Sequence, residues 1–271
     1  GYTGPLFINK NSGFVNNSIS EFNQYCRERN FICELIRFNP VLENEKQLID
    51  LNIHTFYNVK KYVLLDLKRY ADIRENYKKN YRKEIKRYDT ISERIKSNIN
   101  TDSVSKFRNL YHKQMLEKNA DSYYLFTENY FEHLEELLRT NGCMYFVEDN
   151  NEMKSAVVFI FDKHTAYYYH SCRDTQDLDS RWYNKLLLDY AFKEFRERGL
   201  YYCMIGGGVT NSEDDNLLSF KRNISPLERT FVMGKRILLH EKYNQTIEIW
   251  ENQFPHLKEK YSDFLEKFRL T

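Results

Sequence analysis

The residues best suited to chemistry lie in one segment, where three glycines end an apolar run and a basic side chain follows. Gly206, Gly207 and Gly208 come directly after residues 200–205, a run typical of a buried strand. Glycines at a strand end leave backbone N–H groups open to a close ligand. An acidic stretch and a short helical pattern then lead to Lys221. An ammonium near an open backbone could stabilise negative charge that develops on a reacting oxygen.

The segment from Ile205 to Pro226 resembles the Fem family of peptidyltransferases and their FemAB-like relatives among the GNAT-fold acyltransferases. Three further stretches fit the same pattern: Tyr2-Thr3-Gly4-Pro5, Ile36-Arg37-Phe38-Asn39-Pro40 and Trp182-Tyr183-Asn184-Lys185-Leu186-Leu187. Their order and spacing extend the resemblance over most of the chain. It implies an α/β fold of the GNAT type and an aminoacyltransferase or acyltransferase that acts on an amine of a peptidoglycan precursor.

The resemblance also implies that Lys221 is the catalytic residue, since Fem-like proteins place a lysine after phenylalanine in such a role. Its ammonium would stabilise the tetrahedral oxyanion of aminoacyl transfer. A surface lysine on a short helix is the structural alternative. We expect the substrate to be bound by eleven further residues: Tyr2, Gly4, Arg37, Arg74, Tyr169, His170, Asn184, Gly206, Gly207, Gly208 and Phe220.

The loop expected at residues 173–181 bears on the acyl donor. GNAT enzymes that use acyl-CoA normally cradle its pyrophosphate there, in a glycine-containing loop at a helix N-terminus. Here the loop has no glycine and contains Asp174, Asp177 and Asp179, which would repel a diphosphate. The sequence therefore favours an aminoacyl-tRNA as donor with no cofactor required, and acyl-CoA is the alternative.

Composition limits the remaining classes of protein. The 271 residues include 41 Lys and Arg against 39 Asp and Glu, and a net charge of +2 does not by itself suggest a nucleic-acid binder. Five scattered cysteines without a Cys-x-x-Cys pair make a zinc site or a disulfide framework unexpected. No apolar run is long enough for a membrane span. We expect a cytoplasmic protein without a metal.

A weak internal repeat suggests a duplicated unit. Residues 25–31 resemble residues 194–200, with Arg27 matching Arg196, and in both copies an amphipathic helix ends at Asn or Gly before an apolar strand. The first copy lacks its early elements, so we expect a tandem GNAT-like fold with a truncated first copy and a longer natural N-terminus. The predicted domains are 1–87 for the incomplete copy, 88–235 for the complete copy and 236–271 for a helical tail that packs back on the first.

The complete copy has a pattern for every GNAT element. Helices are expected from about Asp102, from an N-cap at Thr127 and over residues 181–198. Strands are expected over residues 89–95, 143–148, 155–161, 165–172 and 200–205. In the first copy the pattern predicts a helix over residues 18–29 and strands over 31–36, 53–57 and 62–67, with residues 2–5 at the end of a further strand. Helices are also expected from about His240 and from Pro255.

Residues 69–87 read as a single helix between the copies. Its buried stripe would consist of Ile73, Tyr77, Tyr81, Ile85 and Tyr88, and basic residues, Arg74 among them, crowd the other faces. A solvated basic face is one interpretation. A contact surface for phosphates of tRNA or of a nucleotide-linked substrate is the other.

Several residues keep two interpretations. Arg37 follows a strand at the place that Gly206 takes in the second copy, so it could bind a phosphate or carboxylate or form a structural ion pair. His170 and Cys172 share a strand face but lack an evident activating partner, which favours a core or cleft lining. Asp215 and its acidic neighbours could take a proton from an incoming amine or form a solvated loop.

Two functions compete with the Fem-like one. The first is an N-acyltransferase that uses acyl-CoA or a carrier-bound thioester on an amino sugar of an envelope polysaccharide. The second is a GNAT-fold module that binds a peptide or glycan without catalysis. The expected partners are thus a cell-wall precursor or amino sugar and a charged tRNA, with the oligomeric state left open.

Overall fold

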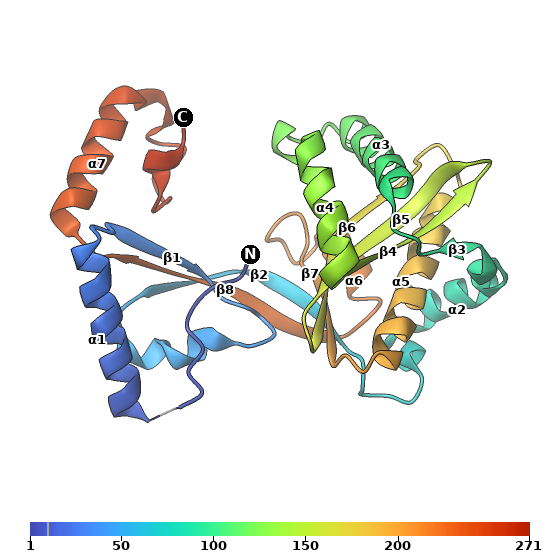
Figure 1. The fold of residues 1–271 in the computed structure, drawn as a ribbon, viewed down its shortest axis with the longest axis horizontal. Coiled ribbons are helices and arrows are strands. Elements are labelled where there is room, and N and C mark those ends of the chain that lie inside the picture. Colours follow the sequence, from blue (N-terminus) through green and yellow to red (C-terminus); the bar gives the residue numbers. More distant parts are fainter. Residues whose placement is uncertain (10) are drawn as a thin grey trace. The chain divides into compact units, whose positions relative to one another are not determined.

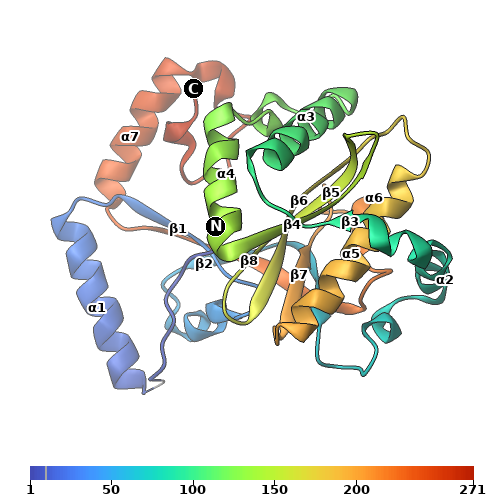
Figure 2. The same cartoon turned by 45° about the vertical axis from the view of Figure 1, so that its right-hand side comes forward.

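The computed structural model describes residues 1–9 and 11–271, which form two compact units (Figures 1 and 2). Unit 1 consists of Gly1–Lys60 and Thr230–Thr271, and unit 2 of Lys61–Arg229. Two long strands, β2 (Thr55–Asp66) and β8 (Leu227–Ile237), each contribute residues to both units.

Unit 2 contains a mixed sheet in the order β2-β7-β6-β5-β4-β3. Its strands are β3 (Ile95–Lys96), β4 (Gly142–Asp149), β5 (Glu152–Phe161), β6 (Thr165–Arg173) and β7 (Tyr202–Gly206). Its helices are α2 (Lys79–Tyr88), α3 (Thr101–Glu117), α4 (Glu128–Asn141), α5 (Ser180–Glu197) and α6 (Asn216–Lys221). Neighbouring strands run antiparallel except β6 and β7, which pair in parallel.

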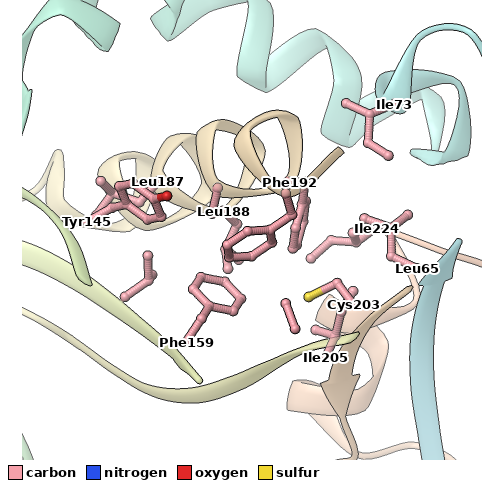
Figure 3. Close-up of a cluster of buried hydrophobic side chains, with 14 of the residues drawn as sticks. Leu65, Ile73, Tyr145, Phe159, Leu187, Leu188, Phe192, Cys203, Ile205 and Ile224 are labelled. Atoms are coloured by element: carbon pink, nitrogen blue, oxygen red, sulfur yellow. The ribbon is translucent and has the colours of Figure 1, made fainter. Parts of the chain in front are cut away.

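Helices cover both faces of this sheet. On one face α3 and α4 bury Phe107 and Phe131 against β4 and β5. On the other, α5 and α2 form the larger core, in which Leu188 and Phe192 of α5 pack towards Phe159 and the β7 strand (Figure 3). The apolar spacing of residues 186–195 puts a broad stripe on one side of α5, and this burial fixes where the helix N-terminus lies relative to the strand ends.

Unit 1 is smaller. It contains α1 (Ser12–Glu28), β1 (Cys33–Arg37) and α7 (His240–Gln253), with strands in the order β1-β8-β2 and β1 antiparallel to β8. Short 3₁₀ segments complete it: Asn44–Gln47, Ile49–Leu51, Pro255–Leu257 and Lys267–Arg269. Its core is a small cluster around Ile36, Phe38, Leu48 and Val232.

Most predicted elements of residues 101–221 are confirmed, but residues 69–87 do not form one helix. A 3₁₀ segment, Ile73–Asn76, is followed by extended backbone at Tyr77 and Lys78 before α2 begins. The Lys78 N–H donates to the Asn223 carbonyl at 2.9 Å, a bond outside any helix, and this interrupts the helical pattern.

Other predictions of secondary structure were wrong. Residues 89–94 form a 3₁₀ helix and leave only Ile95–Lys96 as strand. The two strands expected over 53–57 and 62–67 are one strand, β2, because its exposed polar residues read as a turn. Residues 2–5 are not a strand, and β8 was missed.

The compact units also divide the chain differently from the predicted domains, since α2 belongs with unit 2 and the boundaries lie at residues 60/61 and 229/230. The C-terminal segment and the N-terminal segment belong to the same unit.

Candidate active site

A cleft opens in unit 2 where the parallel strands β6 and β7 separate. Their pairing covers only Thr165 to Tyr167 on β6 and Tyr202 to Met204 on β7. Beyond this point a cavity of about 260 Å³ lies among β6, α3, α5 and α6. It is lined by Gln114, Lys118, Tyr168, Ser171, Cys172, Arg173, Arg181, Asn184, Lys185, Leu217 and Phe220.

A β-bulge lies on each strand near this separation. On β6, Val158 pairs with His170 but Phe159 pairs with Tyr168, so Tyr169 is an extra residue. On β7, Ile205 is the extra residue opposite β2. An extra residue reverses the alternation of side chains. Tyr168 therefore packs against the α5 core, whereas Cys172 belongs to the α3–α4 core.

The glycine turn fits closely between its neighbours. Gly206 has φ +84°, a conformation that favours glycine, and a Cβ there would lie 3.4 Å from the Lys221 Nζ. At Gly207 a Cβ would come within 2.6 Å of the Lys61 carbonyl oxygen, so only glycine fits. The run of glycines thus lets the chain turn tightly against β2 and brings its backbone beside the lysine.

Helix α6 positions Lys221. The Asp215 carboxylate caps this helix, accepting from the Leu218 N–H at 2.9 Å and from the Thr210 N–H at 2.8 Å. These backbone hydrogen bonds, Thr210 first, lower the pKa of Asp215 to about 2. Asp215 therefore caps α6, and its low pKa makes its carboxylate a weak proton acceptor.

Lys221 is buried, with 7% of the residue exposed, so it is not a surface lysine. Its Nζ donates to the Gly207 carbonyl at 2.7 Å and lies 5.9 Å from the centroid of the Tyr168 ring. The neighbouring Arg222 points elsewhere, to Glu213 and Glu228, both at 2.5 Å. The ammonium is thus held against the glycine turn, next to a tyrosine that lines the cleft.

Tyr168 is a site residue that sequence reasoning missed. Burial raises its pKa to about 12, although the neighbouring Ser171 and Asn184 side chains oppose this rise. Asn184, which the sequence singled out, is thereby linked to the cleft wall. The prediction chose Tyr169 instead, because the bulge that sends Tyr168 towards Lys221 leaves no signal in the sequence.

Four cations line the cleft: Lys118, Arg173, Arg181 and Lys185. Exclusion of water and the charge of Arg173 lower the pKa of Lys118. The Arg173 guanidinium donates to the Ser180 hydroxyl at 3.1 Å, and Lys185 pairs with Glu84 on α2 at 2.5 Å. The cleft is therefore suited to a negatively charged group.

His170 lies in an aromatic cluster with Tyr111 and Tyr130. Cys172 packs in the α3–α4 core and also lines the cleft. The His170 Nε2 is 2.6 Å from the Tyr130 hydroxyl, which also donates to the Tyr169 hydroxyl at 3.0 Å. Burial lowers the pKa of His170 to about 4 and raises that of Cys172. A neutral imidazole and a protonated thiol do not make a nucleophilic pair.

Arg74 does not lie on a phosphate-binding surface. It is 9% exposed, and its guanidinium donates to Asp189 at 2.7–3.2 Å and to Asp89 at 2.8 Å. The hydrogen bond with Asp89 and the bond and charge of Asp189 raise the pKa of Arg74. The residue expected to bind substrate instead fixes α5 to the segment before α2, since Tyr77 also donates to Asp189 at 3.0 Å.

The aspartates of the β6–α5 loop are engaged within the protein. Asp174 accepts from Lys113 at 2.9 Å, and the Asp177 carboxylate accepts from the Asp179 N–H at 2.8 Å. The loop thus has the acidic character that the sequence indicated and presents no glycine turn.

The remaining candidates, Tyr2, Gly4 and Arg37, gather in unit 1. The Tyr2 ring meets Phe231 edge-on at 6.0 Å, and the Arg37 guanidinium lies 5.2 Å from the same ring. Gly4 has φ +105°, and a Cβ there would lie 2.8 Å from Asn44 and 3.0 Å from Ile36. The candidates are thus divided between the two units, and within unit 2 Arg74, Tyr169 and His170 do not join the group around Lys221.

The described residues, 1–9 and 11–271, contain neither a membrane-spanning helix nor a metal-binding cluster. No helix among them is long and apolar enough to cross a membrane. They contain no group of three or more His, Cys, Asp or Glu able to hold a metal ion.

The family follows from sequence comparison. A profile described as "Acetyltransferase (GNAT) domain" matches residues 75–221, more than half of the chain and nearly all of unit 2. The chain belongs to the GNAT acetyltransferase family. The separating parallel strands and the cleft between them lie within this GNAT domain. No curated protein sequence matches the chain.

Solved structures extend the likeness beyond the GNAT domain. FemX aligns with a TM-score of 0.62 at 11% identity, over 87% of this chain and 79% of FemX. L-PGS from Bacillus licheniformis aligns with a TM-score of 0.55 at 13% identity, over 80% of this chain and 72% of that one. A conserved protein of unknown function from Bacteroides thetaiotaomicron gives 0.59 at 11% identity, over 82% and 75%. The expected resemblance to a Fem-like fold is thereby confirmed.

Proposed function

We propose that this GNAT protein is an aminoacyltransferase of the Fem type. It would move an aminoacyl group from a charged tRNA to an amine of a cell-envelope precursor. The observation that carries the proposal is the position of Lys221, buried against the glycine turn where β6 and β7 separate. An ammonium held there needs little reorganisation to meet developing negative charge.

The reaction needs only the two substrates. The acceptor amine attacks the ester carbonyl, a C–N bond forms, and the carbonyl oxygen becomes an oxyanion that Lys221 stabilises. The C–O bond to the ribose then breaks, and the ribose hydroxyl leaves with the proton that the amine gives up. The Gly207 carbonyl accepts one N–H of the ammonium and so holds the Lys221 Nζ near Tyr168, which lines the cleft. Tyr168 and Asn184 form the adjoining wall and would orient the acyl group.

The cleft favours a donor whose charge is spread over several phosphates. Its four cations attract anions, while the loop before α5 offers aspartates in place of the glycine turn that cradles a diphosphate. A tRNA donor and a cell-wall precursor acceptor would place the reaction in the cytoplasm.

Acyl-CoA is the second candidate donor, because the family is one of acetyltransferases and the same four cations could neutralise a pyrophosphate. The protein would then be an N-acyltransferase that acts on an amino sugar.

We also propose that unit 1 is a reduced copy of the GNAT domain. Helix α1, a left-handed Asn30 and strand β1 follow one another as do α5, a left-handed Gly199 and β7. A complete unit-1 domain in a close homologue would support the duplication.

A transfer assay tests the function. Labelled amino acid on tRNA is incubated with the protein and a muramyl pentapeptide, and the labelled peptide is measured by mass. Transfer from tRNA supports the proposal. Tight calorimetric binding of acetyl-CoA together with acetylation of an amino sugar would replace it by the second candidate.

A further inference from the structure

An aromatic surface lies on unit 2 where the segment between α3 and α4 meets strand β6. Its members, which we call the tyrosine surface, are Tyr123, Tyr124, Phe126, Tyr130 and Tyr169. Three of them are strongly exposed: Tyr123 by 75%, Tyr124 by 48% and Tyr169 by 41%. Large exposed rings that gather at one place mark a binding surface more often than scattered ones do. The proposed transfer uses none of these side chains.

Ring contacts and a hydrogen bond join the members into one cluster. Tyr123 meets Tyr124 edge-on, with centroids 5.4 Å apart, and meets Phe126 in the same way at 6.4 Å. Phe126 stacks on Tyr130 at 4.2 Å, with ring planes inclined by 19°. The Tyr130 hydroxyl donates to the Tyr169 hydroxyl at 3.0 Å. The cluster is thus continuous from the segment before α4 to strand β6.

The backbone that carries these rings is held in place. The Asp121 carboxylate accepts from the Tyr123 N–H at 2.9 Å and so caps the 3₁₀ segment Ser122–Tyr124. The His112 Nε2 on α3 donates to the Phe126 carbonyl at 2.9 Å. Rings that are fixed before a ligand arrives lose little conformational entropy on binding, so this surface is prepared for a ligand.

Hydroxyl groups converge beside the rings. The Tyr130 hydroxyl lies 2.6 Å from the His170 Nε2. Burial raises the pKa of Tyr111 to about 12, and Tyr124 and Tyr169 add to this rise, so the three hydroxyls lie close together. Burial also raises the pKa of Tyr130 and lowers that of His170 to about 4. The buried groups Tyr111, Tyr130 and His170 are therefore uncharged hydrogen-bonding partners at neutral pH.

Charged side chains are nearly absent from the two segments that form the surface. Residues 119–127 contain one charged residue, Asp121, and residues 165–172 contain none. A nucleic acid would need cations for its phosphates, which these segments lack. A purely apolar ligand would take the tyrosine hydroxyls out of water without offering them partners. The surface thus fits a ligand that is uncharged, has an apolar face and is rich in hydroxyls.

We propose that the tyrosine surface binds a sugar ring of a neutral saccharide. One face of a pyranose ring presents C–H groups, which would stack on the exposed rings of Tyr123 and Tyr124. Its hydroxyls both donate and accept, and they would hydrogen-bond with the hydroxyls at the edge of the surface, that of Tyr169 among them. The inference goes beyond the proposed function, since it involves neither Lys221 nor an acyl donor.

Saccharide binding is measured without transfer, so that it can fail separately from the proposed function. The probe is N,N′-diacetylchitobiose, a neutral disaccharide, titrated into the full chain in a calorimeter. The test variant carries Tyr123→Ala and Tyr169→Ala. The control carries Tyr25→Ala and Tyr57→Ala, which replace two tyrosines of unit 1 that are 47% and 44% exposed. A third variant, with Tyr123→Phe and Tyr169→Phe, keeps both rings and removes their hydroxyls.

Removal of the two rings should weaken binding about tenfold or more, because stacking and hydrogen bonds are both lost. The phenylalanine variant should lose about threefold, because only the hydrogen bonds are removed. The control should bind as the wild type does. Since the ligand is uncharged, its affinity should stay constant between about 0.05 M and about 0.5 M salt.

Three results would overturn the inference: no saturable binding of the disaccharide, equal losses in the test and control variants, or an affinity that falls steeply with salt. A wild-type oligomer that dissociates in the test variant, with no saccharide bound, would also overturn it and assign the rings to a protein interface. Circular dichroism of each variant shows that it is folded. Saccharide binding as described but without any transfer from charged tRNA would sink the proposed function and leave this inference standing.

Discussion

The two units contain the same local arrangement with different ends. In unit 2, α5 ends at Gly199 and β7 leads to the glycine turn beside Lys221. In unit 1, α1 is followed by Asn30 and β1 ends at Arg37, whose guanidinium lies over an aromatic ring. The helix and strand alone therefore do not determine the chemistry at the strand end. The residues at the strand end decide whether a close-fitting glycine turn with a buried ammonium follows, or an arginine over an aromatic ring.

Each unit also contains a buried ion pair. The largest expected effect comes from comparing the loss of stability when one carboxylate of each pair is replaced. Asp189→Asn in unit 2 should lower the free energy of unfolding by about 3 kcal/mol, because it leaves the buried Arg74 without its full charge partner. In unit 1, Glu34 pairs with Arg236 at 2.5 Å, and Glu34→Gln should cost less because the Glu34 side chain is 20% exposed. Denaturant unfolding measures both. Equal losses would mean that burial does not distinguish the two pairs.

The second prediction concerns the proposed catalytic lysine. Lys221→Met should lower turnover about a hundredfold to a thousandfold, because it removes the charge that would stabilise the oxyanion. The matched variant is Arg37→Met, at the corresponding strand end of unit 1, which should leave turnover within a few fold. Single-turnover transfer measures this. Full activity of the Lys221→Met variant would show that the site lies elsewhere, and a comparable loss in the Arg37→Met variant would give unit 1 a direct role.

The third prediction compares two glycines. Gly207→Ala places a Cβ 2.6 Å from a backbone oxygen, so β7 or β2 must shift, at a cost of about 2 kcal/mol, and the lysine loses its position. Gly4→Ala in unit 1 should lower stability but not turnover. Thermal unfolding and the transfer assay separate the two cases. A Gly207→Ala variant that stays active and stable would contradict the close fit of this turn.

The smallest effect is a pH dependence. Asp215 has a pKa of about 2 in the fold and about 3.9 when unfolded, so its contribution to stability is complete above about pH 4. The contribution is lost as the pH falls towards 2. Acid unfolding of Asp215→Asn should therefore lack this part of the wild-type pH dependence. Glu34 in unit 1, whose pKa is also lowered, should behave alike on replacement by Gln. If the stability of wild type and of the Asp215→Asn variant fell equally with decreasing pH, the Asp215 cap would not contribute to the pH dependence.

Local patterns were sufficient for much of unit 2. Apolar spacing predicted α3, α4 and α5, and alternating and apolar runs predicted β4, β5 and β6 within a few residues. The same reasoning failed where long-range contacts decide the backbone. Lys78 bonds to Asn223 and breaks the helix expected over 69–87, and β8 forms beside β1 from residues far away in the chain.

The candidate site likewise contains some residues that the sequence predicted and others that depend on long-range contacts. Lys221, Asn184, Phe220 and the glycines were predicted, and they lie at or beside the cleft of unit 2. Arg74 was misassigned, because a basic residue in a basic segment gives no sign of the buried Asp189 that it meets. Tyr168 was missed because the β-bulge that turns its side chain towards Lys221 leaves no signal in the sequence.

The sequence by itself determined the order of helices and strands in the GNAT domain, the glycine turn and the lysine after it, since these depend on residue types and short-range periodicity. Tertiary structure alone decided that β6 and β7 separate, that a bulge turns Tyr168 rather than His170 towards the lysine, and that Arg74 is neutralised inside the protein. A bulge is one extra residue between two paired strands, and a buried charge needs a partner distant in sequence. Both depend on contacts that no stretch of the chain specifies on its own.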